Sequence, residues 1–332
     1  MNEQNPYRES VPPLSSEIIR PLWSVMIPTY NCASYLRETL KSVLAQDPGA
    51  DMMQIEVVDD CSTQDDPKSV VEELGGDRVS FYQQPQNVGH IKNFQTCLER
   101  AKGQLVHLLH GDDCVRPGFY QKMQSLFESN PEIGAAFCRH IHMDEKGHWH
   151  YISPLERLES GILDNWLEQI AVRQRIQTPS MVVRRDVYEK LGGFDRRLSW
   201  TEDWEMWIRI AAHYPVGYEV EPLALYRQHS SSSTSKKVQI GEDIQDLRRA
   251  INIVKDYLPD TRRAVLTKQA LKNYAFYALQ TARLFTLNGD RNSALNQLKE
   301  AMQCNTSLGI IYTVLKLRLK LLASTLKAQS QN

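Results

Sequence analysis

The stretch Leu105-Val-His-Leu-Leu-His-Gly-Asp-Asp113 joins a short apolar run to a glycine and two adjacent acids. Its mostly apolar first half predicts a strand in the middle of a sheet that is covered on both faces. Open α/β sheets bind ligands at the carboxyl ends of their strands, which is where Asp112 and Asp113 lie. Adjacent carboxylates repel each other unless a cation or a hydrogen-bond donor is present. Taken alone, the stretch is equally typical of a solvated Asp-Asp turn.

The sequence around this stretch alternates strands and helices. Strands are expected at residues 23–27, 54–58, 79–83 and 105–109, and helices at residues 33–45, 67–74, 92–101 and 117–129. This order is typical of a parallel α/β sheet that binds a nucleotide. Neither a G-x-G-x-x-G after the first strand nor a P-loop sequence is present, and polar residues or acids close three of the strands instead. We therefore expect side chains and a metal, rather than a glycine-rich loop, to hold the nucleotide.

The composition excludes several classes of protein. The 332 residues are 42% hydrophobic and 24% charged, as in ordinary globular proteins. A formal net charge of −1 provides no basic field, so no nucleic-acid partner is expected. Six scattered cysteines without a C-x-x-C pair indicate reduced thiols and a cytoplasmic location. Residues 1–22 are expected to form a loose tail without a secretory signal, and no stretch is apolar enough to predict a transmembrane helix.

The middle of the chain is less regular. A strand is expected at 135–138 and a hairpin at 140–151, followed by a strand at 178–183, helices at 185–191 and 204–212, and a strand at 223–226. The serine-rich residues 230–235 are expected to form a flexible loop. The hairpin carries four histidines, which suit either a metal site or alternating exposed positions, and both interpretations stay open. They are His140, His142, His148 and His150.

The last third of the chain is predicted to be helical. Helices are expected at 244–257, 261–287 and 292–302, with a turn at 287–290 that makes an antiparallel pair. The segment Leu315-Lys-Leu-Arg-Leu-Lys-Leu321 alternates with a period of two, but its flanks favour a helix. Its basic residues suit contact with an anionic membrane surface, and packing against the domain is the alternative.

Seven stretches of the sequence resemble, in the same order, the family 2 glycosyltransferases, an inverting group with the GT-A fold. They are Val25-Met-Ile-Pro-Thr-Tyr-Asn31, Val57-Val-Asp-Asp-Cys-Ser62, Asn87-Val-Gly89, His110-Gly-Asp-Asp113, Gly192-Gly-Phe-Asp195, Thr201-Glu-Asp-Trp204 and Tyr226-Arg-Gln-His229. The resemblance implies a mixed, mainly parallel sheet flanked by helices over residues 23–236. It does not extend to residues 237–332, which are expected to form an all-helical C-terminal appendage.

The same resemblance implies an activity. The expected reaction is metal-dependent transfer of a sugar, of the hexosyltransferase type, from a nucleotide-diphosphate sugar to a saccharide or lipid-linked acceptor. A UDP-sugar is the expected donor, Mn²⁺ or Mg²⁺ the expected cofactor, and cell-envelope or exopolysaccharide synthesis the expected setting. The expected location is cytoplasmic, extending to the inner face of the membrane through the basic C-terminal segment. The alternative is a catalytically silent relative that acts as a binding or scaffold protein through its helical C-terminus.

The resemblance also implies roles for individual residues. Asp113 and His229 are the expected metal ligands, and Asp203 is the expected base that takes the proton of the acceptor hydroxyl. The residues expected to bind the nucleotide sugar are Pro28, Thr29, Asn31, Asp60 and Asp112. Those expected near the acceptor or the phosphates are Glu202, Trp204 and Arg227. The competing interpretations are an Asx turn for Asp60, an exposed loop histidine for His229, a helix cap for Asp203 and core packing for Trp204.

Overall fold

A computed structural model gives the fold and describes residues 5–15, 19–229 and 233–329; for residues 233–235 and 324–329 it describes the backbone alone. The chain divides into two compact units. Unit 1 consists of Met1–Trp166, Arg175–Arg197 and Arg209–His229. Unit 2 consists of Leu167–Gln174, Leu198–Ile208 and Ser230–Asn332. Two short segments from the middle of the sequence therefore belong with the C-terminal helices.

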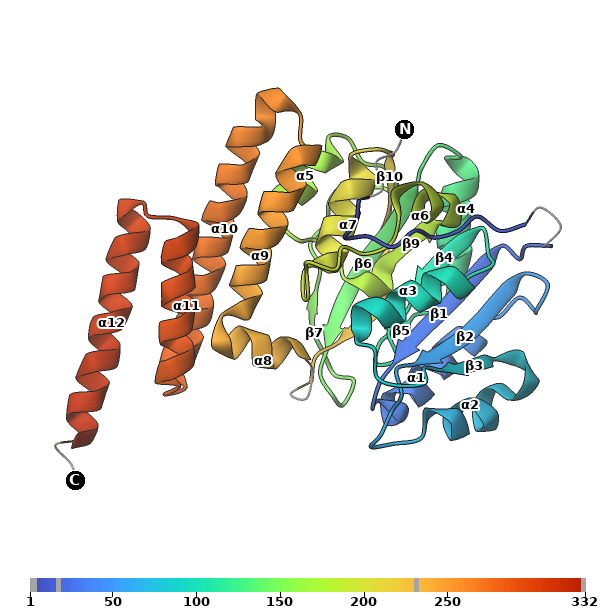
Figure 1. Cartoon of the computed structure of the whole chain (residues 1–332), viewed down its shortest axis with the longest axis horizontal. Coiled ribbons are helices and arrows are strands. Elements are labelled where there is room, and N and C mark those ends of the chain that lie inside the picture. Colours follow the sequence, from blue (N-terminus) through green and yellow to red (C-terminus); the bar gives the residue numbers. More distant parts are fainter. Residues whose placement is uncertain (1–4, 16–18, 230–232, 330–332) are drawn as a thin grey trace. The chain divides into compact units, whose positions relative to one another are not determined.

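Within the described residues, ten strands form one sheet in unit 1 (Figure 1). They are β1 (Trp23–Thr29), β2 (Met53–Asp59), β3 (Ser80–Gln83), β4 (Leu105–Leu108), β5 (Cys114–Val115), β6 (Ala135–Met143), β7 (Trp149–Ile152), β8 (Gly161–Ile162), β9 (Met181–Arg184) and β10 (Val216–Arg227). The order across the sheet is β3-β2-β1-β4-β9-β6-β10-β5, with β7 beside β6 and β8 beside β10. Strands β1 to β4 are parallel, as are β6 and β10, whereas β9 runs antiparallel to β4 and β6. The predicted mixed, mainly parallel sheet flanked by helices is confirmed.

The core of unit 1 forms where the apolar stripes of the helices meet the central strands. All seven residues of β1 are buried, which is expected for a strand covered on both faces. Leu36, Leu40 and Val43 recur at helical spacing in α1 and join the same hydrophobic cluster. The helices of this unit are α1 (Ala33–Leu44), α2 (Pro67–Gly75), α3 (His90–Arg100), α4 (Phe119–Ser129) and α6 (Arg185–Leu191), with 3-10 turns at Gly76–Arg78 and Thr178–Ser180.

A histidine is buried in the middle of β4. Nε2 of His107 lies 2.9 Å from the carbonyl oxygen of Pro179, and Nδ1 lies 3.2 Å from the hydroxyl of Tyr120. The ring stacks on Phe119 with 4.6 Å between centroids. Burial lowers the pKa of His107 to about 4, so the ring is neutral at physiological pH. The strand therefore keeps an uncharged interior up to the point where the acidic loop begins.

The N-terminal segment, which we expected to be a loose tail, packs against unit 1 over residues 5–15. Val11 is buried, and the carbonyl oxygen of Glu9 accepts a hydrogen bond from the amide of Gly193 at 2.8 Å. Arg8 pairs with the buried Asp195 at 3.3 Å. These contacts join residues far apart in the sequence, so local polarity did not reveal them.

The predicted hairpin at 140–151 is present as β6 and β7. His148 and His150 both approach the carboxylate of Asp144, at 3.0 and 3.4 Å. Among the described residues, one group of side chains could hold a metal ion, and it consists of His110, Asp112 and Asp113. It does not lie in this hairpin. The hairpin therefore gives the metal interpretation no support, and the alternative of exposed positions holds for His148 and His150 but not for the buried His140.

Unit 2 is built from helices. They are α5 (Trp166–Val172) and α7 (Glu202–Ala211), which each continue into unit 1, and α8 (Ser233–Ile240), α9 (Glu242–Val254), α10 (Asp260–Leu287), α11 (Arg291–Cys304) and α12 (Leu308–Gln329), with a 3-10 turn at Lys255–Tyr257. The expected flexible loop at 230–235 is wrong for residues 233–235, which begin α8, and its first three residues lie outside the described part. None of the described helices is long and apolar enough to cross a membrane.

Burial of an acid in unit 2 predicts a pH-dependent stability. Asp243 is fully buried, and burial raises its pKa to about 6, although Nε2 of Gln297 donates a hydrogen bond to it at 2.8 Å. The unfolded carboxyl ionises near pH 4, so the folded chain binds the extra proton between about pH 4 and pH 6. Stability contributed by the neutral carboxyl is therefore lost as the pH rises through this window.

We expect the unfolding free energy of Asp243→Asn, measured relative to wild type, to be about 1–3 kcal/mol higher at about pH 7.5 than at about pH 4. Urea unfolding at the two pH values measures this difference. The exposed Asp256 of the same unit supplies the matched control, Asp256→Asn, which should show no such change. A gain that is equal at both pH values contradicts the argument.

Candidate active site

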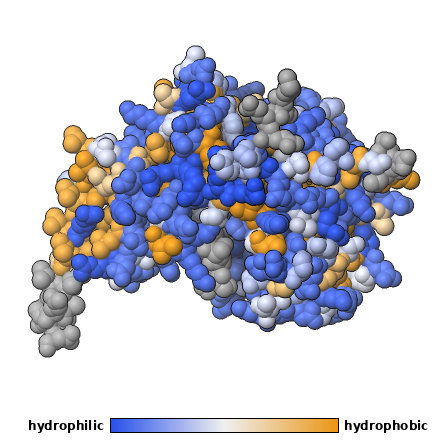
Figure 2. Space-filling model, viewed as in Figure 1, coloured by the Kyte–Doolittle hydropathy of each residue, from blue (hydrophilic) through white to orange (hydrophobic). Residues whose placement is uncertain are grey.

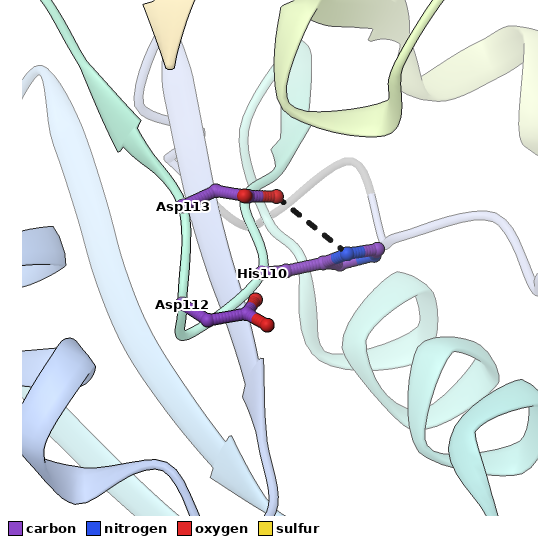
Figure 3. A group of neighbouring side chains, drawn as sticks. All are labelled: His110, Asp112 and Asp113. Atoms are coloured by element: carbon purple, nitrogen blue, oxygen red, sulfur yellow. Dashed lines mark ion pairs between the residues drawn. The ribbon is translucent and has the colours of Figure 1, made fainter. Parts of the chain in front are cut away.

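The loop after β4 brings three ionisable side chains together (Figure 3). One potential ligand atom each from His110, Asp112 and Asp113 lies within 4.8 Å of the others. The amide of Gly111 donates a hydrogen bond to the carbonyl oxygen of Pro28 at 3.0 Å, which ties the loop to the end of β1. A Cβ atom at position 111 would lie 2.5 Å from Oγ1 of Thr29. Glycine is therefore required for the acidic loop to lie against β1.

The carboxylate of Asp113 is buried with one of its oxygens unsatisfied. Oδ1 accepts a hydrogen bond from the backbone amide of Arg227 at 2.8 Å. Oδ2 is buried and has no hydrogen-bond partner among the described residues, and Nδ1 of His110 lies 3.8 Å from it. Burial, together with the adjacent Asp112, raises the pKa of Asp113 well above its usual range. A bound cation would relieve both the missing contact and the repulsion.

Asp112 is paired with His229. Nε2 of His229 lies 3.0 Å from Oδ2 of Asp112, and the imidazole packs against Tyr35 with 5.2 Å between ring centroids. Burial acts to raise the pKa of Asp112, but the hydrogen bond from His229 and the nearby His110 outweigh it and lower that pKa. The structure thus brings His229 to the predicted acids, and its role as a metal ligand stays a prediction.

Arg227 connects the acidic loop to its surroundings. Its Nε donates a hydrogen bond to the carbonyl oxygen of Asp112 at 2.9 Å, and Nη2 pairs with Glu38 of α1 at 2.7 Å. Nη1 points to the carbonyl oxygens of Asp144 and Glu145 at 3.4 and 3.3 Å. Because the residue is 2% exposed, this geometry favours positioning of the loop over the expected contact with acceptor or phosphate.

His110 was not among the residues predicted for the site, and aromatic side chains hold it there. Its ring stacks on Phe94 with 5.0 Å between centroids and 16° between planes. Phe94 in turn packs edge-on against Phe194 of the Gly192-Gly-Phe-Asp195 stretch. The signal in the sequence was the position of His110 directly before the glycine and the two acids. The Gly192–Asp195 stretch therefore has a structural role, because its Phe194 packs against Phe94, on which His110 stacks.

The loops after β1 and β2 are joined by Asn31. Its Oδ1 accepts hydrogen bonds from the amides of Thr63 and Gln64 at 2.8 and 3.0 Å, and its own amide donates to Oγ of Ser62 at 2.8 Å. Asn31 has a φ of +50°, a left-handed conformation that asparagine tolerates better than most residues. Thr29 is buried next to it and lies 3.0 Å from Sγ of Cys32. The predicted residues Pro28, Thr29 and Asn31 thus lie together at the carboxyl edge of the sheet.

Asp60 is buried and binds a neighbouring turn. Its two oxygens accept hydrogen bonds from the amides of Val88 and Gly89 at 2.7 and 3.0 Å. Burial raises the pKa of Asp60, and these two donors oppose the rise. The preceding Asp59 binds Ser62 instead, through both the amide and the hydroxyl. The structure shows Asp60 holding the predicted turn at 87–89, and its contact with a nucleotide base stays a prediction.

The remaining predicted residues lie in unit 2, at the start of α7. The carboxylate of Asp203 accepts hydrogen bonds from Nε2 of Gln174 at 3.1 Å and from the amide of Trp204 at 2.6 Å. The amide of Gln174 donates to the hydroxyl of Tyr274 in α10 at 2.9 Å. Glu202 precedes Asp203 and is buried. Two donors and a helix N-terminus all stabilise a negative charge on Asp203.

Trp204 is fully buried, and its indole N–H donates a hydrogen bond to the carbonyl oxygen of Ile170 at 2.8 Å. The ring packs edge-on against Tyr274 with 5.3 Å between centroids. These contacts use both the polar and the apolar surface of the indole. The structure therefore favours core packing for Trp204 over the expected contact with an acceptor.

A single aspartate of α9 holds the turn that leads into α7. Oδ2 of Asp246 accepts hydrogen bonds from the amides of Ser199, Trp200 and Thr201 at 3.1, 2.9 and 3.0 Å, and from the Thr201 hydroxyl at 2.9 Å. Arg249 pairs with its other oxygen at 2.7 Å. Sequence reasoning missed Asp246 because it lies about 45 residues from the turn that it binds.

Comparisons with known proteins agree with this fold. The model of the family described as "Glycosyl transferase family 2" matches residues 24–192, slightly more than half of the chain. An uncharacterized glycosyltransferase of Rickettsia typhi is 26% identical over 230 residues, which cover 68% of this chain and 70% of that protein.

Two solved structures are similar in fold. TarS 1-349 of S. aureus, crystallised in complex with UDP-GlcNAc, aligns with a TM-score of 0.66 at 16% identity and covers 90% of this chain and 88% of that one. The mannosyltransferase PcManGT of Pyrobaculum calidifontis, in complex with GDP-Man and Mn²⁺, aligns with a TM-score of 0.56 at 16% identity and covers 99% and 85% of the two chains. At this identity the likeness concerns the fold alone.

We expect Gly111→Ala to displace the acidic loop, since the new methyl group would meet Thr29 at 2.5 Å. Overpacking of this kind costs about 1–3 kcal/mol of unfolding free energy. Urea unfolding measures this loss. Combining the change with Thr29→Ala, which removes the Oγ1 atom in the way, should restore part of the stability. Gly309→Ala is the control, because a Cβ there meets no atom within 4 Å.

We expect Asp246→Ala to release the turn before α7, because three amides lose their acceptor at once. The loss in unfolding free energy should be about 2–4 kcal/mol, and Asp246→Asn, which keeps one acceptor oxygen, should lose less. Hydrogen exchange of the peptide covering residues 198–204 gives the local readout. Unchanged protection of these amides in Asp246→Ala would contradict the role of this carboxylate.

Proposed function

The chain belongs to glycosyl transferase family 2, and we propose that it transfers a sugar, with inversion at the anomeric carbon, from a nucleotide-diphosphate sugar to a saccharide or lipid-linked acceptor. A UDP-sugar is the proposed donor and Mn²⁺ or Mg²⁺ the proposed cofactor. UDP-GlcNAc in the TarS complex, and GDP-Man with Mn²⁺ in the PcManGT complex, support a nucleotide sugar and a divalent metal. The proposed setting is cell-envelope or exopolysaccharide synthesis in the cytoplasm, at the inner face of the membrane when the acceptor is a lipid.

The buried, unsatisfied Oδ2 of Asp113 carries this proposal. A buried carboxylate oxygen without a hydrogen bond costs about 1–3 kcal/mol or more, so a second interaction is expected in the working enzyme. The neighbouring donors are carboxylate oxygens and an imidazole, which suit Mn²⁺, and Mg²⁺ prefers the oxygens. A silent scaffold would have no use for this arrangement.

Asp113 is the proposed metal ligand, and His110 and Asp112 lie close enough to contribute. A divalent metal bound here would stabilise the negative charge on the diphosphate leaving group. His229 holds Asp112, and Arg227 holds the loop through the carbonyl oxygen of Asp112 and the amide contact to Asp113. These residues fix the acids in place before any donor binds.

Asp203 is the proposed general base. The acceptor hydroxyl gives its proton to this carboxylate as its oxygen bonds to the anomeric carbon, and the bond from that carbon to the diphosphate oxygen breaks. Hydrogen bonds from Gln174 and from the Trp204 amide orient this carboxylate. Asp60, Pro28, Thr29 and Asn31 are the proposed contacts of the nucleoside.

We expect Asp113→Ala and Asp203→Asn to abolish transfer by different routes. Asp113→Ala should remove metal-dependent donor binding, which calorimetry with UDP and Mn²⁺ measures. Asp203→Asn should leave that binding unchanged and lower kcat about 100-fold or more, because the proton has no acceptor. Full turnover by Asp203→Asn would contradict the assignment of Asp203 as the general base.

A panel of UDP-, GDP- and TDP-sugars with Mn²⁺, read out as slow donor hydrolysis, identifies the donor. Hydrolysis of UDP-sugars that stops on chelation with EDTA is the expected result. The exposed Asp51 offers a matched control, Asp51→Asn, which should behave as wild type. Hydrolysis that is insensitive to EDTA would contradict the metal dependence.

A further inference from the structure

Helix α12 carries two apolar stripes, and one of them is exposed. Ile310, Val314, Leu317 and Leu321 are at most 6% exposed and face the other helices of unit 2. The second stripe consists of Leu308, Tyr312, Leu315, Leu319 and Leu322, which are 50–86% exposed. Figure 2 shows hydrophobic side chains gathered over this helix. Packing of unit 2 explains the first stripe and leaves the second, which is the kind of patch that marks an interaction site.

The charges on α12 have one sign. Its sequence from Leu308 to Gln329 contains no Asp or Glu, and its charged residues are lysines and an arginine. With 3.6 residues per turn, Lys316 and Lys320 lie on one flank of the exposed stripe and Arg318 on the other. An apolar stripe between two basic flanks is typical of helices that lie in the surface of an anionic membrane.

A hollow between α11 and α12 adds a second observation. It has a volume of about 440 Å³, and its lining includes the basic residues Arg291, Lys299 and Arg318 and the apolar residues Leu295, Leu321 and Leu322. Leu322 belongs both to the hollow and to the exposed stripe, so the two surfaces are continuous. Cations beside an apolar wall are the chemistry that recognises a phosphate attached to an acyl chain.

The nearby acids do not cancel this charge. Glu300 is the single acid in the sequence of α11, is 4% exposed, and pairs with Arg248 at 2.8 Å. Asp290 caps the start of the same helix by accepting a hydrogen bond from the amide of Ser293. A second copy of the chain paired through the exposed stripe would bring lysines and arginines together without acids to balance them.

We propose that the exposed stripe of α12 binds the surface of an anionic phospholipid bilayer, with a lipid phosphate in the hollow between α11 and α12. The leucines and Tyr312 enter the boundary between headgroups and acyl chains, and the basic flanks stay at the level of the phosphates. This binding does not depend on the transfer reaction. It requires only the surface that unit 2 already presents.

Co-sedimentation of the full chain with vesicles tests the proposal. We expect at least about tenfold stronger binding to phosphatidylcholine vesicles with about 30 mol% phosphatidylglycerol than to phosphatidylcholine alone, and weaker binding in about 0.5 M NaCl. Leu315→Gln/Leu319→Gln should weaken binding at least tenfold. Lys299→Gln/Arg318→Gln should remove most of the preference for phosphatidylglycerol, at roughly fivefold per basic residue.

Leu155→Gln/Leu158→Gln is the matched control, because these exposed leucines lie in unit 1. Its vesicle binding should equal that of wild type, and urea unfolding checks that every variant is folded. Equal binding to both kinds of vesicle, or none, would overturn the proposal. So would a dimer in analytical ultracentrifugation that Leu315→Gln/Leu319→Gln dissolves, since the stripe would then serve a second copy.

Discussion

The guanidinium of Arg227 lies where four segments of unit 1 meet. It binds a carbonyl of the acidic loop, two carbonyls at the tip of the β6–β7 hairpin and a carboxylate of α1, while its amide binds Asp113. Two adjacent acids, of which Asp113 is buried, are unstable without such neighbours, because each raises the cost of ionising the other. The guanidinium supplies a fixed positive charge that cannot be lost by deprotonation. The position of the acidic loop, and with it the candidate metal site, depends on this residue.

In unit 2, contacts between distant residues likewise hold the proposed base Asp203 in position. Asp246 holds the turn before α7, Gln174 holds Asp203, and Tyr274 holds both Gln174 and the ring of Trp204. Each contact comes from a helix or turn that follows or precedes α7 by many residues. The proposed metal ligand Asp113 thus belongs to unit 1 and the proposed base Asp203 to unit 2.

Much of the sheet and the acidic loop could be predicted because their signals are local. Apolar runs marked β1, β2 and β4, and the residues that close these strands meet at one edge of a parallel sheet. Contacts between distant residues carry no local signal, so Arg227 was expected at a phosphate and Asp246 was not noticed. The packing of residues 5–15 was missed for the same reason. The leucines of residues 315–321 alternate with a period of two, but their flanks favoured the helix that is present, and α12 divides them between a buried and an exposed stripe.

The capping of α7 by Asp246 also bears on how the chain can be divided. A shortened chain that ends at His229 would keep the sheet and the acidic loop, and it would contain every residue that the family model matches. It would nevertheless lack the aspartate that orders residues 199–201 and the tyrosine behind Gln174. Recombination that exchanged the C-terminal helices for those of a relative would have to carry the segments 167–174 and 198–208 with them. The C-terminal helices and the segment that carries Asp203 therefore form one structural block.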